Sequence, residues 1–271
     1  MKTKKGRDDQ GLFIIEGEKL VAEIPAGWHV RAYICAESFK VESRKKGAIF
    51  PFAQDSAKDS AKDSIKQASV ITVSDSRFAS LSDTVTPQGI MAVCEKRVFN
   101  FSDLFSDLFI EDSLKGSLQK PFLLIGERLS DPGNIGTLIR TAAAAGASGV
   151  VLSEGSGDIY NPKTIRASAG AVLRIPVIEG VNLNEVIPIF KQQGIKILAA
   201  HLQGAVLPYD IDLGQGLAIL IGNEASGLSD EISNLADIRV KLLMAPDIES
   251  LNASVAGGIL FYEVVRQRLK L

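Results

Sequence analysis

The sequence has few residues of the kinds that build metal and redox sites. Its 271 residues include two cysteines, two histidines and one tryptophan. Cys35 and Cys94 lie far apart in the sequence, which excludes a CxxC redox pair and a cysteine-rich zinc site. His29 and His201 cannot form a cluster of imidazole ligands, and HExxH is absent. We therefore expect no metal ion.

Long apolar runs are missing as well. The apolar stretch 217–222 is far shorter than the roughly 20 residues that cross a bilayer, and the charged N-terminus lacks the apolar core of a signal peptide. Neither a P-loop nor a GxGxxG pattern after an early strand is present, which disfavours the ordinary nucleotide folds. We expect a cytoplasmic protein that does not bind membranes.

What is present is typical of a globular chain, with 46% hydrophobic and 23% charged residues. The formal net charge of −2 does not itself indicate a nucleic-acid partner. The basic residues are slightly in excess within 1–100 and the acidic residues within 101–271. The front part is therefore the better candidate for a surface that faces phosphates, although the asymmetry is small.

The hydrophobic pattern predicts two α/β domains, at 1–100 and 121–271, joined by a linker at 101–120 that contains a short helix. In the first domain we expect strands and helices in the order strand, helix, strand, strand, helix, strand. The first strand, helix and strand are expected at 12–17, 18–25 and 30–37, and the second strand, helix and strand lie within 68–97. The Asp- and Lys-rich segment 54–68 reads as a solvated helix or loop.

The second domain shows a regular alternation of strands and helices. Strands are expected at 122–126, 149–152, 195–200, 217–221 and 238–243, and helices at 136–146, 162–169, 183–193, 228–235 and 254–269. Such an alternation predicts a parallel sheet covered by helices on both faces. Because ligands of these sheets bind beyond the carboxyl ends of the strands, functional residues should follow the strands.

The first candidate site lies in 127–152. A Pro-Gly turn leads Asn134 and Gly136 into a helix whose unpaired N–H groups could face an anion. Arg140 should project from the second turn of this helix and could grip a phosphate with two of its donors. A helix with a merely solvated arginine explains the spacing equally well.

Two more candidate sites follow later strands. In 217–232 a buried strand leads into Gly222, where a ligand could approach the backbone, and Glu224, at the edge of the core. In 240–268 either Asn252 or Ser254 could cap the last helix, and Gly257 and Gly258 suggest the close approach of another backbone. The simpler reading of the first segment is an ordinary turn between a strand and a helix. The simpler reading of the second is ordinary helix capping and packing.

Together, NxGxxxR (134–140), GNExxG (222–227) and SLNxSVA (250–256) resemble the three signature motifs of the SpoU/TrmH branch of the SPOUT RNA methyltransferases. The front domain resembles the substrate-binding domain often fused to them, through 11–21 and 80–93. This relationship implies an N-terminal ribosomal-protein-like α/β domain that binds RNA. It also implies a C-terminal parallel α/β domain tied in a trefoil knot.

The resemblance implies S-adenosylmethionine as cofactor and methyl transfer to a ribose 2′-hydroxyl of RNA. It assigns Gly222, Leu242, Met244, Leu251 and Asn252 to the cofactor, and Asn252 also to ordering the loop. The catalytic group implied is Arg140, Asn134, Glu224 and Ser254. Because a guanidinium is a poor base, we expect Arg140 to hold an RNA phosphate and orient the hydroxyl.

Ribosomal RNA is the expected substrate, and transfer RNA or a non-catalytic RNA-binding relative are the alternatives. The family further implies a homodimer whose interface includes the last helix. Such proteins usually have a basic helix before the first strand, whereas only residues 2–10 precede it here, so this RNA-contacting element should be short or incomplete.

Overall fold

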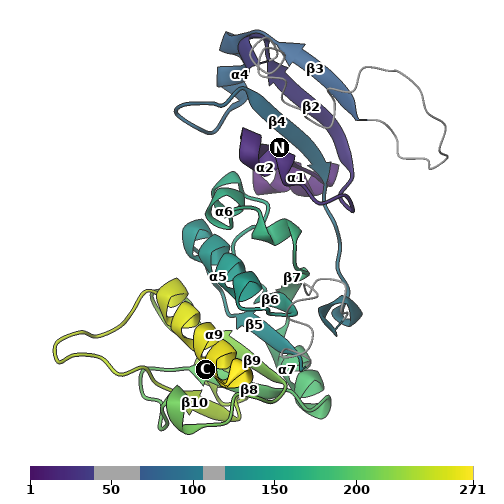
Figure 1. Ribbon diagram of the computed structural model, residues 1–271. Coiled ribbons are helices and arrows are strands. Elements are labelled where there is room, and N and C mark those ends of the chain that lie inside the picture. The colour runs from purple at the N-terminus through teal and green to yellow at the C-terminus, as the bar shows by residue number, and fades with distance from the viewer. Residues whose placement is uncertain (40–67, 106–119, 271) are drawn as a thin grey trace. The chain divides into compact units, whose positions relative to one another are not determined.

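A computed structural model of the chain describes residues 1–39, 68–105 and 120–270 (Figure 1). These residues form two compact units, Met1–Arg97 with Tyr160–Pro162, and Val98–Ile159 with Lys163–Leu271. Most of the segment 54–68 lies outside the described residues. In the expected linker, the 3-10 helix η1 (Phe101–Phe105) is described and 106–119 are not. No helix in the described part of the chain is long and apolar enough to span a membrane.

The first unit is built on a mixed sheet of four strands in the order β1-β4-β2-β3. Strand β4 is antiparallel to β1 and β2, whereas β3 is parallel to β2. The strands are β1 (Leu12–Glu16), β2 (Val30–Ala36), β3 (Ser69–Val73) and β4 (Ile90–Glu95), and the helices are α1 (Lys4–Gln10), α2 (Glu18–Ala22) and α4 (Asp75–Leu81). The strands and helices predicted within 12–37 and 68–97 are thus confirmed.

Helix α1 occupies the segment before β1. Thr3 caps it by accepting a hydrogen bond from the Gly6 N–H, and Gly11 ends it in a left-handed conformation with φ 63°. The expected basic element is therefore present as a helix of seven residues.

The two segments that resemble a substrate-binding domain meet in the first unit. The Glu16 carboxylate accepts hydrogen bonds from the hydroxyls of Ser82 (2.5 Å) and Thr84 (2.7 Å). Gln88 Oε1 accepts one from the Glu18 N–H (2.8 Å) at the start of α2. These bonds hold the loop before β4 against the end of β1 and the start of α2. Much of the resemblance of 11–21 and 80–93 to substrate-binding domains is therefore explained by residues that stabilise the fold of this unit.

The second unit contains a parallel sheet of six strands in the order β10-β8-β9-β5-β6-β7. Its strands are β5 (Phe122–Gly126), β6 (Gly149–Ser153), β7 (Val177–Val181), β8 (Lys196–Ala200), β9 (Leu217–Ile221) and β10 (Ile238–Val240). Its α-helices are α5 (Pro132–Ala144), α6 (Pro162–Ala167), α7 (Leu183–Gln192), α8 (Asp230–Ser233) and α9 (Ala253–Leu269). The unit also contains η1 and the 3-10 helices η3 (Ala171–Leu173) and η4 (Pro208–Asp210).

Three predictions for this unit are wrong in part. Strand β7 was not predicted; it is a short edge strand with Gly180 at φ 70°, which weakens its sequence signal. The predicted strand 238–243 ends at Val240, because its partner β8 ends at Ala200. Helix α5 begins at Pro132, not at 136, because Asp131 caps it and proline is tolerated in the first turn.

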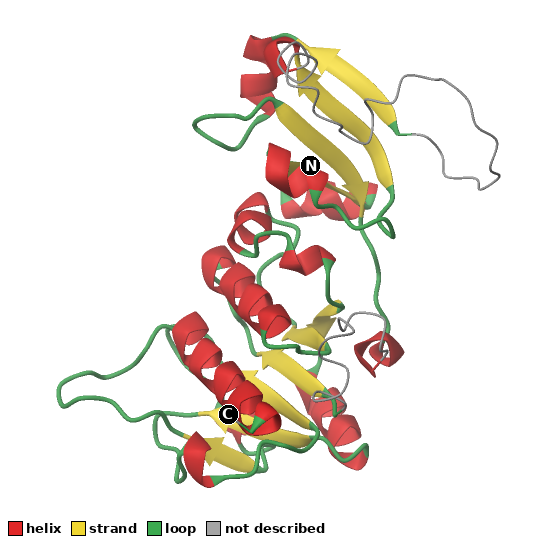
Figure 2. Ribbon diagram, viewed as in Figure 1, coloured by secondary structure: helices red, strands yellow, loops and turns green. Residues whose placement is uncertain are grey.

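Helices cover both faces of the parallel sheet, as predicted (Figure 2). Leu123 and Ile125 of β5 pack with Phe190 of α7 in one core. Phe122 projects to the opposite face, where its ring meets that of Phe261 in α9 at 5.7 Å. Helices α5 and α9 lie side by side on this second face. The sheet is therefore buried on both sides, and its carboxyl edge is left for polar residues.

Candidate active site

The site lies where β5 and β9 end. These strands are paired in register up to Gly126 and Ile221, so the loops that follow them are brought together. Glu224, in the loop after β9, accepts hydrogen bonds from the N–H groups of Ser130 (3.1 Å) and Asp131 (3.2 Å) and from the Ser130 hydroxyl (3.0 Å). One carboxylate thus joins the second motif to the segment just before the first.

The third motif is joined to the first by amide side chains. Asn134 Nδ2 donates to Glu224 Oε1 at 3.2 Å, and Asn252 Nδ2 donates to Asn134 Oδ1 at 2.9 Å. Asn252 Oδ1 in turn accepts from the Ser254 N–H (2.8 Å) and hydroxyl (2.6 Å). We call Glu224, Asn134, Asn252 and Ser254 the polar network. It connects the three motifs by direct hydrogen bonds.

The network identifies the cap of α9. The Asn252 side chain accepts from the backbone N–H groups of Ser254 and Val255, which makes Asn252 the N-cap residue. The sequence offered Asn252 and Ser254 as candidates for the N-cap residue, and the structure has Asn252 in this position. Ser254 is buried and donates its hydroxyl proton to Asn252.

The environment of Glu224 favours its charged form. Partial burial acts to raise its pKa, but the hydrogen bonds from its own backbone N–H, from Ser130, Asn134 and Asp131 outweigh this and lower the pKa below its ordinary value. The carboxylate is therefore ionised at neutral pH and engaged by several donors.

The N-terminus of α5 does not present free N–H groups to an anion. Asp131 Oδ1 accepts from the Asn134 N–H at 2.8 Å, and this bond is the largest contribution that lowers the pKa of Asp131. Lys163 forms an ion pair with the other oxygen at 3.2 Å. The expectation of an anion at this helix terminus is wrong, because a carboxylate of the chain already occupies it.

Beside the network lies a cavity of about 250 Å³. It is bounded by residues after β8 and β9, by the segment after β10, and by the first turns of α9. The predicted cofactor residues Gly222, Leu242, Met244 and Leu251 all line it, as do Glu224, His201, Leu202, Ala253 and Leu260. Asn252 does not line it and lies in the polar network instead. The cavity therefore adjoins the network at Glu224.

Gly222 is required by the fold of its own loop. A Cβ built there would lie 2.3 Å from the carbonyl carbon of Gly227 and from the Leu228 nitrogen. Asn223 and Gly227 exchange backbone hydrogen bonds of 3.1 and 2.9 Å, which close the loop over Gly222. The glycine makes room first for this returning chain and, on its other side, lines the cavity.

Arg140 lies apart from the network, in the third turn of α5 rather than the second, since the helix begins earlier than predicted. Its side chain is exposed and forms no hydrogen bond or ion pair with the residues that the structure describes. Gly136, in the same motif, packs against α6, where its Cβ would lie 2.5 Å from the Thr164 carbonyl oxygen. The guanidinium is thus available to a ligand.

The sequence analysis assigned no role in the site to two residues that shape it. Asn223 Oδ1 accepts the N–H groups of Ala225 and Ser226, and its Nδ2 donates to the Arg128 carbonyl at 2.7 Å. His201 lines the cavity, and its Nδ1 accepts the Gln203 N–H. An asparagine after a strand and before a glycine-rich turn is a detectable signal for Asn223. None marks His201.

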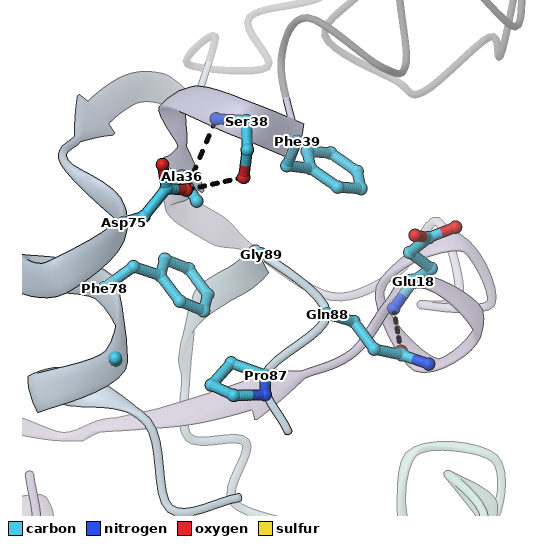
Figure 3. A pocket seen from close by; sticks show the side chains of 10 residues that line it. Glu18, Ala36, Ser38, Phe39, Asp75, Phe78, Pro87, Gln88 and Gly89 are labelled. Carbon is cyan, nitrogen blue, oxygen red and sulfur yellow. Dashed lines mark hydrogen bonds between the residues drawn. The ribbon is translucent and has the colours of Figure 1, made fainter. Parts of the chain in front are cut away.

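A second cavity, of about 420 Å³, lies in the first unit between α2, α4 and the loop before β4 (Figure 3). Its polar rim includes Glu18, Gln88 and Asp75, whose carboxylate accepts from Ser38. Phe39 and Phe78 form part of its wall but are only 6% and 2% exposed, so they offer little ring surface for stacking. It adjoins none of the three motifs, and the cavity beside the polar network remains the candidate site.

The chain thus has two α/β units, and in one of them a cavity and a polar network lie at the carboxyl edge of a parallel sheet, where such sheets bind their ligands. The chain belongs to the SpoU rRNA Methylase family of RNA methyltransferases: the model of this family matches residues 121–262. The model of the MRM3-like substrate binding domain matches residues 1–92. The resemblance drawn from the three motifs is confirmed.

Similar proteins span nearly the whole chain. One is the 23S rRNA (guanosine(2553)-2′-O)-methyltransferase RlmP of Bacillus subtilis, 30% identical, with 97% of this chain and 92% of that protein covered. The mitochondrial rRNA methyltransferase 3 of Mus musculus is 28% identical, over 100% of this chain and 71% of that protein. The AdoMet-bound rRNA methyltransferase from Sinorhizobium meliloti has a TM-score of 0.75 at 26% identity, covering 99% of this chain and 92% of that one.

Proposed function

We propose that the protein transfers a methyl group from S-adenosylmethionine to a ribose 2′-hydroxyl of large-subunit ribosomal RNA. The observation that carries the proposal is the polar network that joins all three motifs beside the 250 Å³ cavity. The relatives named above support it, because they methylate ribosomal RNA and one structure holds AdoMet.

The cavity suits the cofactor chemically. Leu242, Met244 and Leu251 provide apolar walls for an adenine ring, and the backbone around Gly222 and Leu242 provides groups for its edge. When bound, the cofactor supplies an electrophilic methyl group on a sulfonium. We assign Asn252 to holding the loop that carries Leu251, because its side chain bonds Asn134 and caps α9.

The tasks of the chain's own residues are positioning and charge stabilisation. The carboxylate of Glu224 already accepts hydrogen bonds on both oxygens, and Ser254 donates to Asn252, so these two side chains and Asn134 fix the loops of the site. Among the four proposed catalytic residues, Arg140 alone has a side chain without a partner in the described part of the chain, which suits a contact with an RNA phosphate that orients the hydroxyl.

The proposal includes a trefoil knot in the second unit and a cytoplasmic location. The family resemblance supports the knot. In the described residues the segment after β8 lies against the end of β10, because Val206 pairs with Val240 and a Cβ on Gly204 would lie 2.5 Å from the carbonyl carbon of Val240. The location is supported by Cys35 and Cys94, which are buried as free thiols, as suits a reducing compartment.

The protein is further proposed to form a homodimer through α9. Val255, Ile259 and Tyr262 are exposed by 50%, 39% and 53% and lie on one face of the helix. Replacing Ile259 with Glu should place a charge in this face, shift the protein to monomers and reduce methylation. Sedimentation of wild type and Ile259→Glu tests this, and a fully dimeric, active variant would contradict it.

The decisive experiment measures methyl incorporation from labelled S-adenosylmethionine into unmodified ribosomal RNA. The methylated nucleotide is then located by resistance to alkaline cleavage. Unmodified transfer RNA is tested in parallel. If only transfer RNA is labelled, the substrate is transfer RNA and not ribosomal RNA. Cofactor and RNA binding without transfer to either RNA would identify a non-catalytic relative.

A further inference from the structure

Arg128 has an unusual backbone conformation for a residue with a side chain. It follows β5 and has φ 47°, in the left-handed region that glycine adopts without strain. The end of β6 and the loop after β9 hold it there: its N–H donates to Ser153 Oγ at 2.8 Å, and its carbonyl accepts from Asn223 Nδ2 at 2.7 Å. Backbone strain of this kind clusters at functional sites.

The Arg128 side chain extends over the ends of β5 and β6. A Cβ built on Gly155 would lie 3.5 Å from its Cγ, and its Nη2 lies 3.3 Å from Oε1 of the buried Glu127. Glu127 is itself held by the N–H (2.9 Å) and hydroxyl (2.7 Å) of Ser229. The guanidinium is thus oriented by a fixed carboxylate, while the side chain remains 54% exposed. Its other N–H groups have no partner among the described residues.

The strand order places Arg128 in line with the rest of the site. The cavity lies at the ends of β8, β9 and β10, the polar network at β9 and β5, and Arg128 over β5 and β6. Neighbouring strands are about 4.8 Å apart, so the end of β6 lies about 10 Å from that of β9. An RNA strand with its ribose at the network would cross this edge.

We propose that Arg128 binds a backbone phosphate of the RNA, next to the methylated nucleotide on the β6 side of the site. A forked, exposed guanidinium is suited to two hydrogen bonds with one phosphate. The inference rests on the proposed function, and it adds an RNA contact outside the three motifs.

The test compares Arg128→Gly and Arg128→Lys with wild type. Glycine removes the guanidinium and accepts the left-handed backbone, so the fold should persist. We expect the KM for an unmodified large-subunit ribosomal RNA transcript to rise about 5- to 20-fold in Arg128→Gly, with kcat within about 3-fold. The slope of log Kd against log salt should fall by about 0.7 to 0.9, the loss of one phosphate contact. Arg128→Lys should keep the wild-type slope with a smaller rise in KM.

Lys196→Ala is the matched control, because Lys196 is an exposed cation at the opposite, amino end of β8. Its KM and salt slope should equal those of wild type. The proposal would be overturned if Arg128→Gly kept the wild-type KM and salt slope. It would also be overturned if Arg128→Lys lost as much salt slope as Arg128→Gly. Loss of cofactor affinity in Arg128→Gly, measured by calorimetry, would show a structural role of the loop instead. If wild type methylates no RNA, the proposed function fails and not the assignment of Arg128 alone.

Discussion

Arg140 differs from the other polar residues of the site because its side chain has no partner among the described residues. Asn134, Glu224 and Ser254 are each committed to hydrogen bonds that hold loops together. Substitutions of these residues should therefore affect the structure of the site, whereas substitution of Arg140 should affect the reaction alone.

Arg140→Ala should lower methyl transfer by roughly 100-fold or more, because the ribose hydroxyl would lose the contact that orients it. The cofactor Kd should stay within a few fold, because Arg140 does not line the cavity. Radiolabel incorporation and calorimetry measure the two quantities. A folded variant that loses cofactor affinity together with activity would show that Arg140 belongs to the cofactor site and not to the RNA site.

Glu224→Gln should reduce stability in a pH-dependent way. Because the folded pKa of Glu224 is lowered, its charge stabilises the protein above the unfolded pKa of about 4.3, and this contribution is lost as pH falls through the folded pKa. We expect a loss of about 1–3 kcal/mol at pH 7, typical of hydrogen bonds to a charged group. Urea denaturation from pH 7 to pH 3 should show the difference from wild type shrinking below about pH 4. A constant difference would be evidence against the role of the charge.

At the scale of elements, the two adjacent glycines of α9 have different surroundings. A Cβ on Gly257 would lie 2.5 Å from Cδ2 of Leu138 in α5, whereas one on Gly258 would meet only Thr141 Cγ2, at 3.5 Å. Within the described residues these neighbours are side chains, of α5 and of Phe261, so the approach of another backbone stays a prediction that concerns the proposed dimer. Gly257 permits the close packing of α5 and α9.

Gly257→Ala and Gly258→Ala form a matched pair on one helix. The first should destabilise the protein by about 1–3 kcal/mol, because Leu138 must move in a packed core. The second should stabilise the single chain by up to about 1 kcal/mol, because alanine favours the helix and finds room within this chain. Thermal and urea denaturation of both variants decide the matter, and equal effects of the two would refute the packing argument.

At the scale of the whole molecule, the chain is divided between two cores. The cavity and the polar network are formed entirely by residues of Val98–Ile159 and Lys163–Leu271. The family model for the substrate-binding domain matches the other unit. Cofactor binding and RNA recognition should therefore be separable.

Deleting residues 1–100 should leave a folded domain that binds S-adenosylmethionine but methylates RNA poorly. Tyr160 belongs to the first unit and contacts the rings of Phe13 and Trp28, so Tyr160→Ser should accompany the deletion to avoid exposing an apolar ring. Calorimetry with the cofactor and methylation of a ribosomal RNA transcript test the two halves of the prediction. Full activity of the truncated protein would show that the first unit is dispensable for recognition.

The sequence by itself determined the family and the succession of strands and helices apart from β7. Its alternating pattern predicts β5, β6, β8 and β9, because buried parallel strands are short apolar runs. It also marks the loops that carry Asn134, Glu224 and Asn252, since polar residues after such strands stand out. These signals are local, and a single chain displays them.

Only the tertiary structure decided which of these residues meet and what the glycines are for. Asn134 and Asn252 are 118 positions apart, and their hydrogen bond depends on α9 packing beside α5. The tight contacts of Gly136, Gly222 and Gly257 are with segments distant in the sequence or with a chain that turns back on itself. Arg128 looks ordinary in the sequence, because backbone strain comes from the loops that hold a residue. Sequence periodicity reports burial along a single helix or strand. These contacts depend instead on which strands lie side by side in the sheet, and so on which loops meet at its edge.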